Sequence, residues 1–332
     1  MKAAEVRGSV LLDYLPLVAV WGGSYAVTEV ALGAFTPAEV ALWRAVIGAS
    51  FLTVLLVAGG SGLPRLGRGG VVRIVALSIL TASGQVSAAA AQLRMPSGMV
   101  AVLCSMTPLI SVVYYWLRRT PIPSLKWVSV SLGVVGVAVL LSPTAHLDHL
   151  GLCLGLLAAA VFALAGILGA DFFPDSTFSP TQLTVAQLAA TAVLLAPEVA
   201  FARSPHAALT WPAVAAVLAL GVLSAGIGNV LFWRVLRRGG PVLAGTTYQS
   251  VPVVAVITGV LVFDETLDAG EIIGMALVLT GLALLLPLVR KAAAGTEDPH
   301  LEEGLIGVHC EESSVGGNLE VVREEHAKRF AR

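Results

Sequence analysis

Long apolar segments separated by short polar joints run through most of the sequence. A bilayer core about 30 Å thick is crossed by about 20 apolar residues in a helix, because no backbone polar group goes unpaired in lipid. The joints carry turn-forming residues, as in GGSGLPRLGRGG at 59–70 and RRGGP at 237–241. The pattern predicts an all-α membrane protein of ten transmembrane helices, near residues 14–32, 36–58, 71–92, 96–117, 125–141, 150–171, 180–201, 211–236, 241–263 and 269–290.

Composition agrees with a membrane protein. Hydrophobic residues make up 57% of the chain and charged residues only 12%, whereas about 25% charged residues is usual in soluble domains. Polar and charged sequence is concentrated at the two ends. We therefore expect a cytoplasmic N-terminus at 1–13 and a charged, disordered tail at 291–332 that transport does not require.

Basic residues near the ends of the predicted helices indicate the orientation of the chain. With the N-terminus inside, only Arg94 and Arg203 fall on the outer side. The cytoplasmic side then collects Lys2, Arg7, Arg65, Arg68, Arg73, Arg118, Arg119, Lys126, Arg234, Arg237, Arg238, Arg290 and Lys291. This bias predicts a multi-pass protein of the cell (inner) membrane with both termini in the cytoplasm.

The two halves of the chain share landmarks in the same order. AVW at 19–21 corresponds to AVF at 160–162, and Phe35-Thr36-Pro37 corresponds to Phe178-Ser179-Pro180. A constant offset of 144 then matches Gly84 with Gly228, Gln85 with Asn229, Arg94 with Arg238 and Pro108 with Pro252. A repeat of five helices is inverted because five is odd. We predict two inverted five-helix repeats, at 14–141 and 150–290.

These landmarks resemble those of the EamA branch of the drug/metabolite transporter superfamily. The resemblance covers residues from about 14 to 290 and is carried by Trp21-Gly22, Pro37 with Arg44, Thr107-Pro108, Val251-Pro252, Asp264-Glu265-Thr266-Leu267, and Gly274 with Gly281. It implies a ten-helix transporter that moves a small organic metabolite, often outward, by alternating access. The sequence departs from the family in its first half, where the acidic joint is replaced by Arg118-Arg119-Thr120-Pro121.

The acidic joint of the second half has two interpretations. Asp268 with Glu271 has the spacing of a capping box for the last helix, which is the simpler reading. Contact between Asp264, Glu265 or Asp268 and a substrate is the alternative.

Polar residues within the predicted helices point to a central cavity, because such residues are costly in lipid and face a cavity or a partner. The alternative is that they only join helices. Pro108 and Pro252 each free a backbone carbonyl near mid-membrane and are candidate hinges. The candidate cavity residues are Trp21, Tyr25, Gln85, Gln92, Cys104, Ser111, Asn229, Trp233, Tyr248 and Gln249.

Arg44 is the candidate buried charge. It lies about two turns into the second predicted helix, with Glu39 five residues before it and Glu29 late in the first helix. A buried guanidinium needs a counter-charge or several carbonyls. A structural ion pair and the binding of an anion or substrate are both open.

The sequence lacks the signatures of an ATP-driven or metal-dependent enzyme. None of its four lysines follows a glycine-rich phosphate loop, and His146 to His149 is the nearest approach to a metal cluster. We expect no catalytic residues, metal, cofactor or nucleic-acid partner. The predicted function is secondary transport of an amino acid or related compound, as export. A polytopic membrane enzyme or a structural assembly factor is the alternative.

Overall fold

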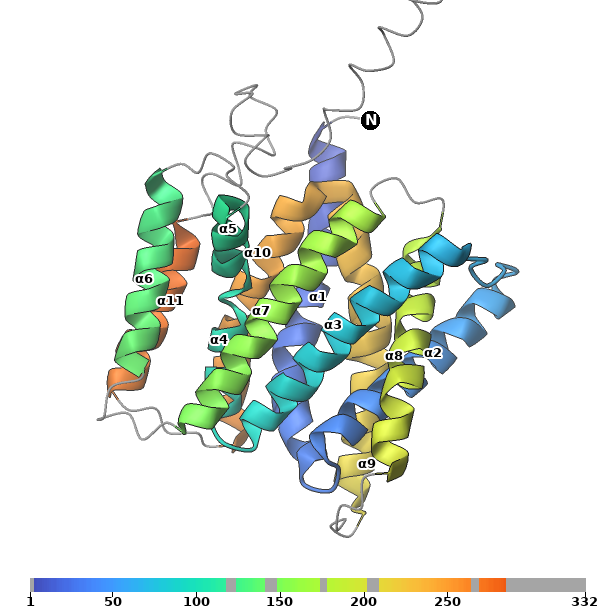
Figure 1. Cartoon of the computed structure of the whole chain (residues 1–332), viewed down its shortest axis with the longest axis horizontal. Coiled ribbons are helices and arrows are strands. Elements are labelled where there is room, and N and C mark those ends of the chain that lie inside the picture. Colours follow the sequence, from blue (N-terminus) through green and yellow to red (C-terminus); the bar gives the residue numbers. More distant parts are fainter. Residues whose placement is uncertain are drawn as a thin grey trace, which may run out of the picture.

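Helices form every regular element in the described part of the chain (Figure 1). The computed structural model describes residues 3–117, 124–140, 148–173, 178–201, 209–263 and 269–284, without side chains at some positions. The helices are α1 (Ala3–Leu32), α2 (Pro37–Ala58), α3 (Arg68–Gln92), α4 (Ser97–Cys104), α5 (Thr107–Leu117), α6 (Ser124–Leu140), α7 (His149–Phe172), α8 (Pro180–Phe201), α9 (Trp211–Ala219), the π-helix η1 (Leu220–Gly228), α10 (Asn229–Phe263) and α11 (Ala269–Ala283).

Six helical segments within the described residues are long and apolar enough to cross a membrane. They are Leu12–Leu32, Pro37–Ala58, Arg68–Gln92, His149–Gly169, Pro180–Phe201 and Trp211–Arg238. Large apolar side chains lie on their outer surface, with Val54 65% and Val193 73% exposed. Such exposure over many helices is expected where lipid and not water is the solvent. The protein is a multi-pass membrane protein.

Three further apolar helices are shorter than a full span. They are Ser97–Ser111, Trp127–Gly136 and Ile272–Gly281. α6 and α11 pack side by side at one flank of the molecule (Figure 1). A Cβ added at Gly281 of α11 would lie 2.7 Å from the Ser129 carbonyl oxygen of α6, so the two backbones approach closely.

α2 and α8 begin with the same local structure. Thr36 and Glu39 form a capping box in which the Thr36 amide donates to Glu39 Oε2 at 2.7 Å. Ser179 and Gln182 repeat it, with the Ser179 amide donating to Gln182 Oε1 at 2.9 Å. Each box satisfies amides that a helix start leaves unpaired, and a proline follows at the first helical position. Both starts agree with the predicted boundaries to within one residue.

The predicted loop at 237–241 is helical, and α10 runs through it from 229 to 263. The helix nevertheless reverses its direction. Phe232 and Tyr248 are 16 residues apart, which would separate them by about 24 Å in a straight helix. Their ring centroids are only 6.1 Å apart. The prediction of a loop at 237–241 is therefore corrected only locally. The chain still turns between Phe232 and Tyr248, but the residues between them are helical.

The predicted helix at 96–117 is interrupted. α4 ends at Cys104 and α5 begins at Thr107, directly before Pro108, which has no N–H to donate to the Cys104 carbonyl. The Thr107 hydroxyl donates to that carbonyl at 2.7 Å and lies 3.3 Å from the Ala159 carbonyl of α7. A hydroxyl thus satisfies the acceptor that the proline frees. The backbone of α10, in contrast, stays helical through Pro252.

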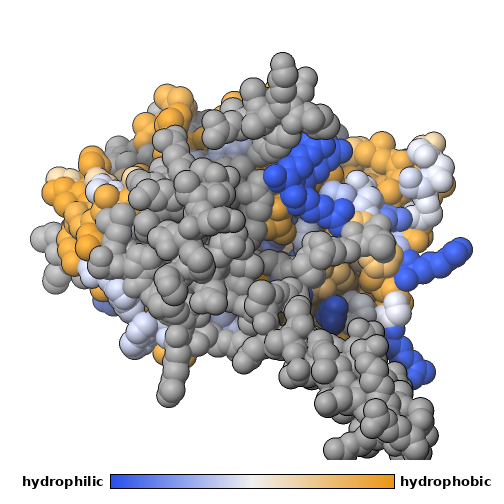
Figure 2. Space-filling model, turned by 90° about the horizontal axis from the view of Figure 1, so that it is seen from above, coloured by the Kyte–Doolittle hydropathy of each residue, from blue (hydrophilic) through white to orange (hydrophobic). Residues whose placement is uncertain are grey.

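Strongly polar side chains gather at one end of the molecule. Figure 2 views the end at which the described part of α1 begins, and it shows hydrophilic patches there with hydrophobic surface around the edges. At this end Arg73 donates to the Phe172 carbonyl at 3.1 Å, and Arg237 donates to the Phe178 carbonyl. The bases of α3 and α10 therefore bind carbonyls at the end of α7 and just before α8.

Several predicted features lie outside the described residues. They are the tail at 291–332, the acids Asp264, Glu265 and Asp268, the basic joint at 118–121 and the His146 loop. The side chains of Pro108, Gln249 and Glu271 are also outside the description, although their backbones are helical.

Candidate functional site

A cavity of about 140 Å³ lies between α1, α2, α3, α7, α8, η1 and α10. Helices from both halves of the chain contribute to it. Its wall combines aromatic rings, amides, hydroxyls and one guanidinium with small apolar residues. A concave, mostly apolar site with a few polar groups is the usual form of a small-molecule site. The volume is below the roughly 300 Å³ at which pockets for drug-sized ligands begin, so a small metabolite fits it better.

Six predicted cavity residues line this cavity together with Arg44. They come from three different helical regions and are Trp21, Tyr25, Gln85, Gln92, Asn229 and Tyr248. Gln85 and Asn229, which the offset of 144 pairs in the sequence, therefore face one space from α3 and α10.

The other predicted residues lie elsewhere. Cys104 does not line the cavity and is buried in an apolar cluster against which Tyr25 packs. Ser111 lies beyond the break before α5 and donates to the Thr107 carbonyl at 3.0 Å. Trp233 is one turn past Asn229, and its ring packs beside Gly169 of α7. Gln249 follows Tyr248 in α10, but its side chain is outside the description.

Arg44 contacts a hydroxyl and not a carboxylate. Its Nη2 donates to Ser224 Oγ of η1 at 2.6 Å, and its buried Nε has no hydrogen-bond partner. Among the described residues no ion pair joins it to Glu39, whose carboxylate caps α2. The geometry thus differs from a structural Arg44–Glu39 pair, because the capping box turns Glu39 toward the start of its own helix.

Close packing of α2 against η1 brings Arg44 to Ser224. A Cβ added at Gly48 would lie 2.8 Å from the Gly221 carbonyl oxygen, and one added at Gly221 would lie 2.6 Å from Ile47 Cβ. Only glycine allows this approach. η1 itself is a π-helix, a form that is rare and frequent at functional sites.

An aromatic cluster contains two residues of the cavity wall, Trp21 and Tyr248. The Trp21 ring stacks on Phe232 with centroids 5.3 Å apart, and its centroid lies 5.7 Å from that of Tyr248. The indole Nε1 donates to the Ser224 carbonyl at 3.3 Å. Ser224 therefore holds Trp21 through its carbonyl and Arg44 through its hydroxyl.

Two glycines each contact an aromatic ring from the first helix of one half. A Cβ added at Gly228 would lie 2.5 Å from Trp21 Nε1, and one added at Gly84 would lie 2.5 Å from Phe162 Cε1. Gly84 and Gly228 are 144 residues apart, and Trp21 and Phe162 end the matching AVW and AVF segments. The same ring-on-glycine contact thus occurs once in each half.

Sequence reasoning missed several lining residues, among them Gln187, Thr191 and Phe162. Gln187 lies 143 residues after Arg44, which is the offset between Pro37 and Pro180, so the repeat contained a signal for it. Its Nε2 lies 3.5 Å from Thr81 Oγ1, and its backbone carbonyl accepts from Ser78 at 3.0 Å.

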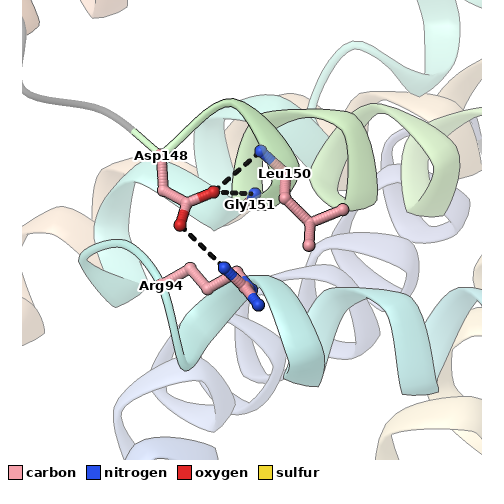
Figure 3. Close-up of polar contacts among 4 residues, drawn as sticks. All are labelled: Arg94, Asp148, Leu150 and Gly151. Carbon is pink, nitrogen blue, oxygen red and sulfur yellow. Dashed lines mark hydrogen bonds and ion pairs between the residues drawn. The ribbon is translucent and has the colours of Figure 1, made fainter.

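Ion pairs tie the two halves together at opposite ends of the molecule. Asp13 of α1 is buried and lies 2.7 Å from Arg238 Nη1 and 3.7 Å from Arg234 Nη1 of α10. At the other end Arg94 Nη1 donates to Asp148 Oδ2 at 2.8 Å (Figure 3). We call these the Asp13 latch and the Asp148 latch.

The Asp148 latch also caps a helix. Asp148 Oδ1 accepts from the amides of Leu150 at 2.8 Å and Gly151 at 3.1 Å (Figure 3). The Gly151 amide, followed by the Arg94 guanidinium, lowers the pKa of the Asp148 carboxyl below the ordinary aspartate value of 3.8. The carboxylate is therefore ionised throughout the physiological pH range.

A bundle of apolar helices around a mostly apolar cavity with a few polar groups is an arrangement that a membrane transport protein can use. The EamA-like transporter family model matches this chain twice, at residues 12–142 and 149–286. The chain belongs to the EamA-like transporter family, as the sequence motifs predicted.

Individual relatives agree with this assignment. The chain is 25% identical over 280 residues to the uncharacterized inner membrane transporter YedA of Escherichia coli (strain K12), covering 81% of this chain and 88% of that protein. It is 26% identical over 275 residues to Protein PecM of Dickeya dadantii (strain 3937), covering 82% and 90%. One solved crystal structure shares the fold, with a TM-score of 0.63 and 18% identity over 86% of this chain and 99% of that one.

Proposed function

We propose that this protein moves a small organic metabolite, an amino acid or related compound, out of the cell by alternating access through the cavity between its two halves. The observation that carries the proposal is the cavity lining itself, in which Gln85 and Asn229 face one space from equivalent positions. Directional hydrogen bonds from such amides orient a bound molecule. No catalytic role is proposed for any residue.

The proposed architecture is ten membrane-spanning segments in two inverted repeats, 14–141 and 150–290. The reversal within α10 supports it, because this helix then supplies parts of two segments. The paired capping boxes at Thr36 and Ser179 and the paired ring-on-glycine contacts support it as well.

The two latches support alternating access. Arg94 and Arg238 are 144 residues apart, and each pairs with an acid near the start of the first apolar segment of the other half, Leu12–Leu32 or His149–Gly169. We propose that the Asp13 latch restrains the cytoplasmic side and the Asp148 latch the outer side, so that opening the cavity to one side breaks the latch there.

Transport is tested in liposomes that contain the purified full-length chain. Radiolabelled amino acids, purines and sugars are offered with and without a pH gradient, and empty liposomes are the control. Saturable movement of at least one class supports the proposal. Chemical conversion of a compound without its movement would instead establish a membrane enzyme.

Orientation is tested separately in intact cells. Single cysteines at Ser61 and Asp268 are treated with a membrane-impermeant thiol reagent. We expect Asp268→Cys to be modified and Ser61→Cys to be protected, because both termini are proposed to be cytoplasmic. The reverse pattern contradicts the proposed orientation.

A further inference from the structure

Arg44 is the one side chain with a formal charge at neutral pH among the described residues that line the cavity. The rest of that lining contains no Asp, Glu, Lys or His. The cavity therefore carries one positive charge that no described wall residue neutralises. A guanidinium removed from water is stable only with a counter-charge or full hydrogen bonding.

Arg44 has donors to offer a ligand. Guanidinium has five N–H groups, and the described contacts use one of them on Ser224 Oγ at 2.6 Å. Nε is buried and has no partner. Carboxylates match the planar fork of arginine and bind it through two parallel hydrogen bonds. The Ser224 contact holds the guanidinium in place while Nε remains unpaired.

The position that matches Arg44 in the second half carries no charge. Gln187 faces the cavity from α8 at the place that Arg44 occupies in α2, and its amide is neutral. A single negative charge on a ligand would neutralise the cavity. A second negative charge would remain uncompensated in a site of low dielectric, and a cationic ligand would be repelled.

The other lining groups fit the body of such a ligand. Trp21, Tyr25, Phe162 and Tyr248 supply aromatic surface, while Gln85 and Asn229 supply neutral hydrogen-bonding groups. From the charge, the unpaired Nε and this lining, we infer that the cavity selects organic monoanions and holds their carboxylate on Arg44. The inference rests on the proposed function and narrows its substrate class from amino acids to related compounds with a single carboxylate. A free amino acid also carries an ammonium group, and no carboxylate of the described lining would pair with it. Ser224 is a positioning residue.

Binding is measured first, by isothermal titration on the purified full-length chain in detergent. The probes are three matched pairs in which only a carboxylate is replaced by an amide: benzoate and benzamide, lactate and lactamide, N-acetylphenylalanine and its amide. In at least one pair we expect the carboxylate to bind about tenfold to a hundredfold more tightly, as for a charge-assisted hydrogen bond. Arg44→Gln should abolish that preference, and Arg44→Lys should reduce it.

Gln187 provides matched controls at the mirror position. Gln187→Ala should leave the carboxylate preference unchanged. Gln187→Arg adds a second cation, so it should raise the affinity of phthalate, a dianion, relative to benzoate. This variant keeps Arg44 and therefore tests the charge argument even where an Arg44 variant does not fold. Equal binding of carboxylate and amide in every pair, or a preference that survives Arg44→Gln, overturns the inference. An unchanged phthalate to benzoate ratio in Gln187→Arg overturns it too.

Uptake into liposomes then separates this inference from the proposed function. Saturable transport of neutral or cationic compounds without carboxylate preference would preserve the transporter and overturn the substrate class. Arg44-dependent binding of monoanions without movement of any compound would preserve the binding site and overturn transport.

Discussion

Arg44 and Gln187 face the same cavity from α2 and α8, at matching positions of the two halves. The backbone around them is similar, because both helices begin with a proline after a capping box. The two side chains differ in charge and in their hydrogen-bond partners. Arg44 binds the Ser224 hydroxyl at 2.6 Å, whereas Gln187 lies 3.5 Å from Thr81. A duplicated scaffold therefore gives a cavity whose charge lies on one side.

The neighbouring helices differ in the same way. α3 is regular, but the segment 144 residues later is the π-helix η1, which carries Ser224. The helix before Pro108 is broken, whereas α10 continues through Pro252. The second half therefore departs from regular α-helix at η1, whose Ser224 contacts Arg44. The first half departs from it just before Pro108. The following predictions compare matched positions, beginning with the largest expected effect.

The ring-on-glycine contacts should be the most sensitive to substitution. Gly228→Val and Gly84→Val add a side chain where even a Cβ would lie 2.5 Å from a ring atom, and overpacking of this kind costs about 2 kcal/mol. We expect a lower Tm in detergent for both, with the larger loss at Gly228 because indole is bulkier than phenyl. Gly23→Val is the control, since nothing would lie within 4 Å of a Cβ added at Gly23. Wild-type Tm values for both variants would contradict the packing.

The two hydroxyls that face Arg44 and Gln187 should differ in importance. Hydrogen bonds to charged groups contribute about 1.5–3 kcal/mol and neutral ones about 1 kcal/mol. For a compound that the parent transports, Ser224→Ala should weaken the apparent affinity by about tenfold, and Thr81→Ala by much less. The measurement is KM in liposomes. Equal losses of apparent affinity would show that the Ser224 contact with Arg44 contributes no more than the Thr81 contact with Gln187.

The Asp13 latch should restrain the cavity more strongly than the Asp148 latch, because Asp13 is more buried. Asp13 is buried between two arginines, whereas the Asp148 side chain is 39% exposed, and exposed ion pairs contribute little. Asp13→Asn should speed modification of a cysteine at Gln85 from the cytoplasmic side, in a background without native cysteines. Asp148→Asn should have a smaller effect from the outer side. Faster modification from the opposite side in either variant argues against the assigned roles.

The Asp148 latch should respond to pH only in acid. Its pKa is lowered by folding, so its contribution to stability is complete above the unfolded value and is lost as the pH falls through the folded one. Between pH 5 and pH 8 we expect Tm to change equally in the wild type and in Asp148→Asn. If the wild type lost Tm between pH 5 and pH 8 and Asp148→Asn did not, the pKa of Asp148 would have to be raised by folding and not lowered.

Much of the helical framework could be predicted from hydrophobic length and capping residues. The predicted segment 180–201 is identical to α8, and 36–58 differs from α2 by one residue. The break before α5 lies beside Pro108, which the sequence marks as a candidate hinge, but hydropathy alone predicted one unbroken helix over 96–117. The sequence predicts the turn at RRGGP as a loop, whereas α10 is continuous through these residues.

The site was predicted only in part, because helical spacing shows which residues share a face and not where the neighbouring helices lie. Gln85 and Asn229 were found through the repeat, and Gln187 was obtainable in the same way. Trp233 lies one turn past Asn229, but its ring packs beside Gly169 of α7 and does not line the cavity. The Arg44–Ser224 contact joins residues 180 positions apart, and it depends on close packing at Gly48 and Gly221.

Transport kinetics of Gln85→Leu and Tyr248→Phe test the central claim most directly, because both residues line the cavity and both changes keep their approximate volume. For a compound that the parent carries, each should weaken the apparent affinity by roughly five- to tenfold at normal membrane abundance, since one such hydrogen bond contributes about 1 kcal/mol. Wild-type kinetics in both variants would contradict the claim that the substrate passes through this cavity.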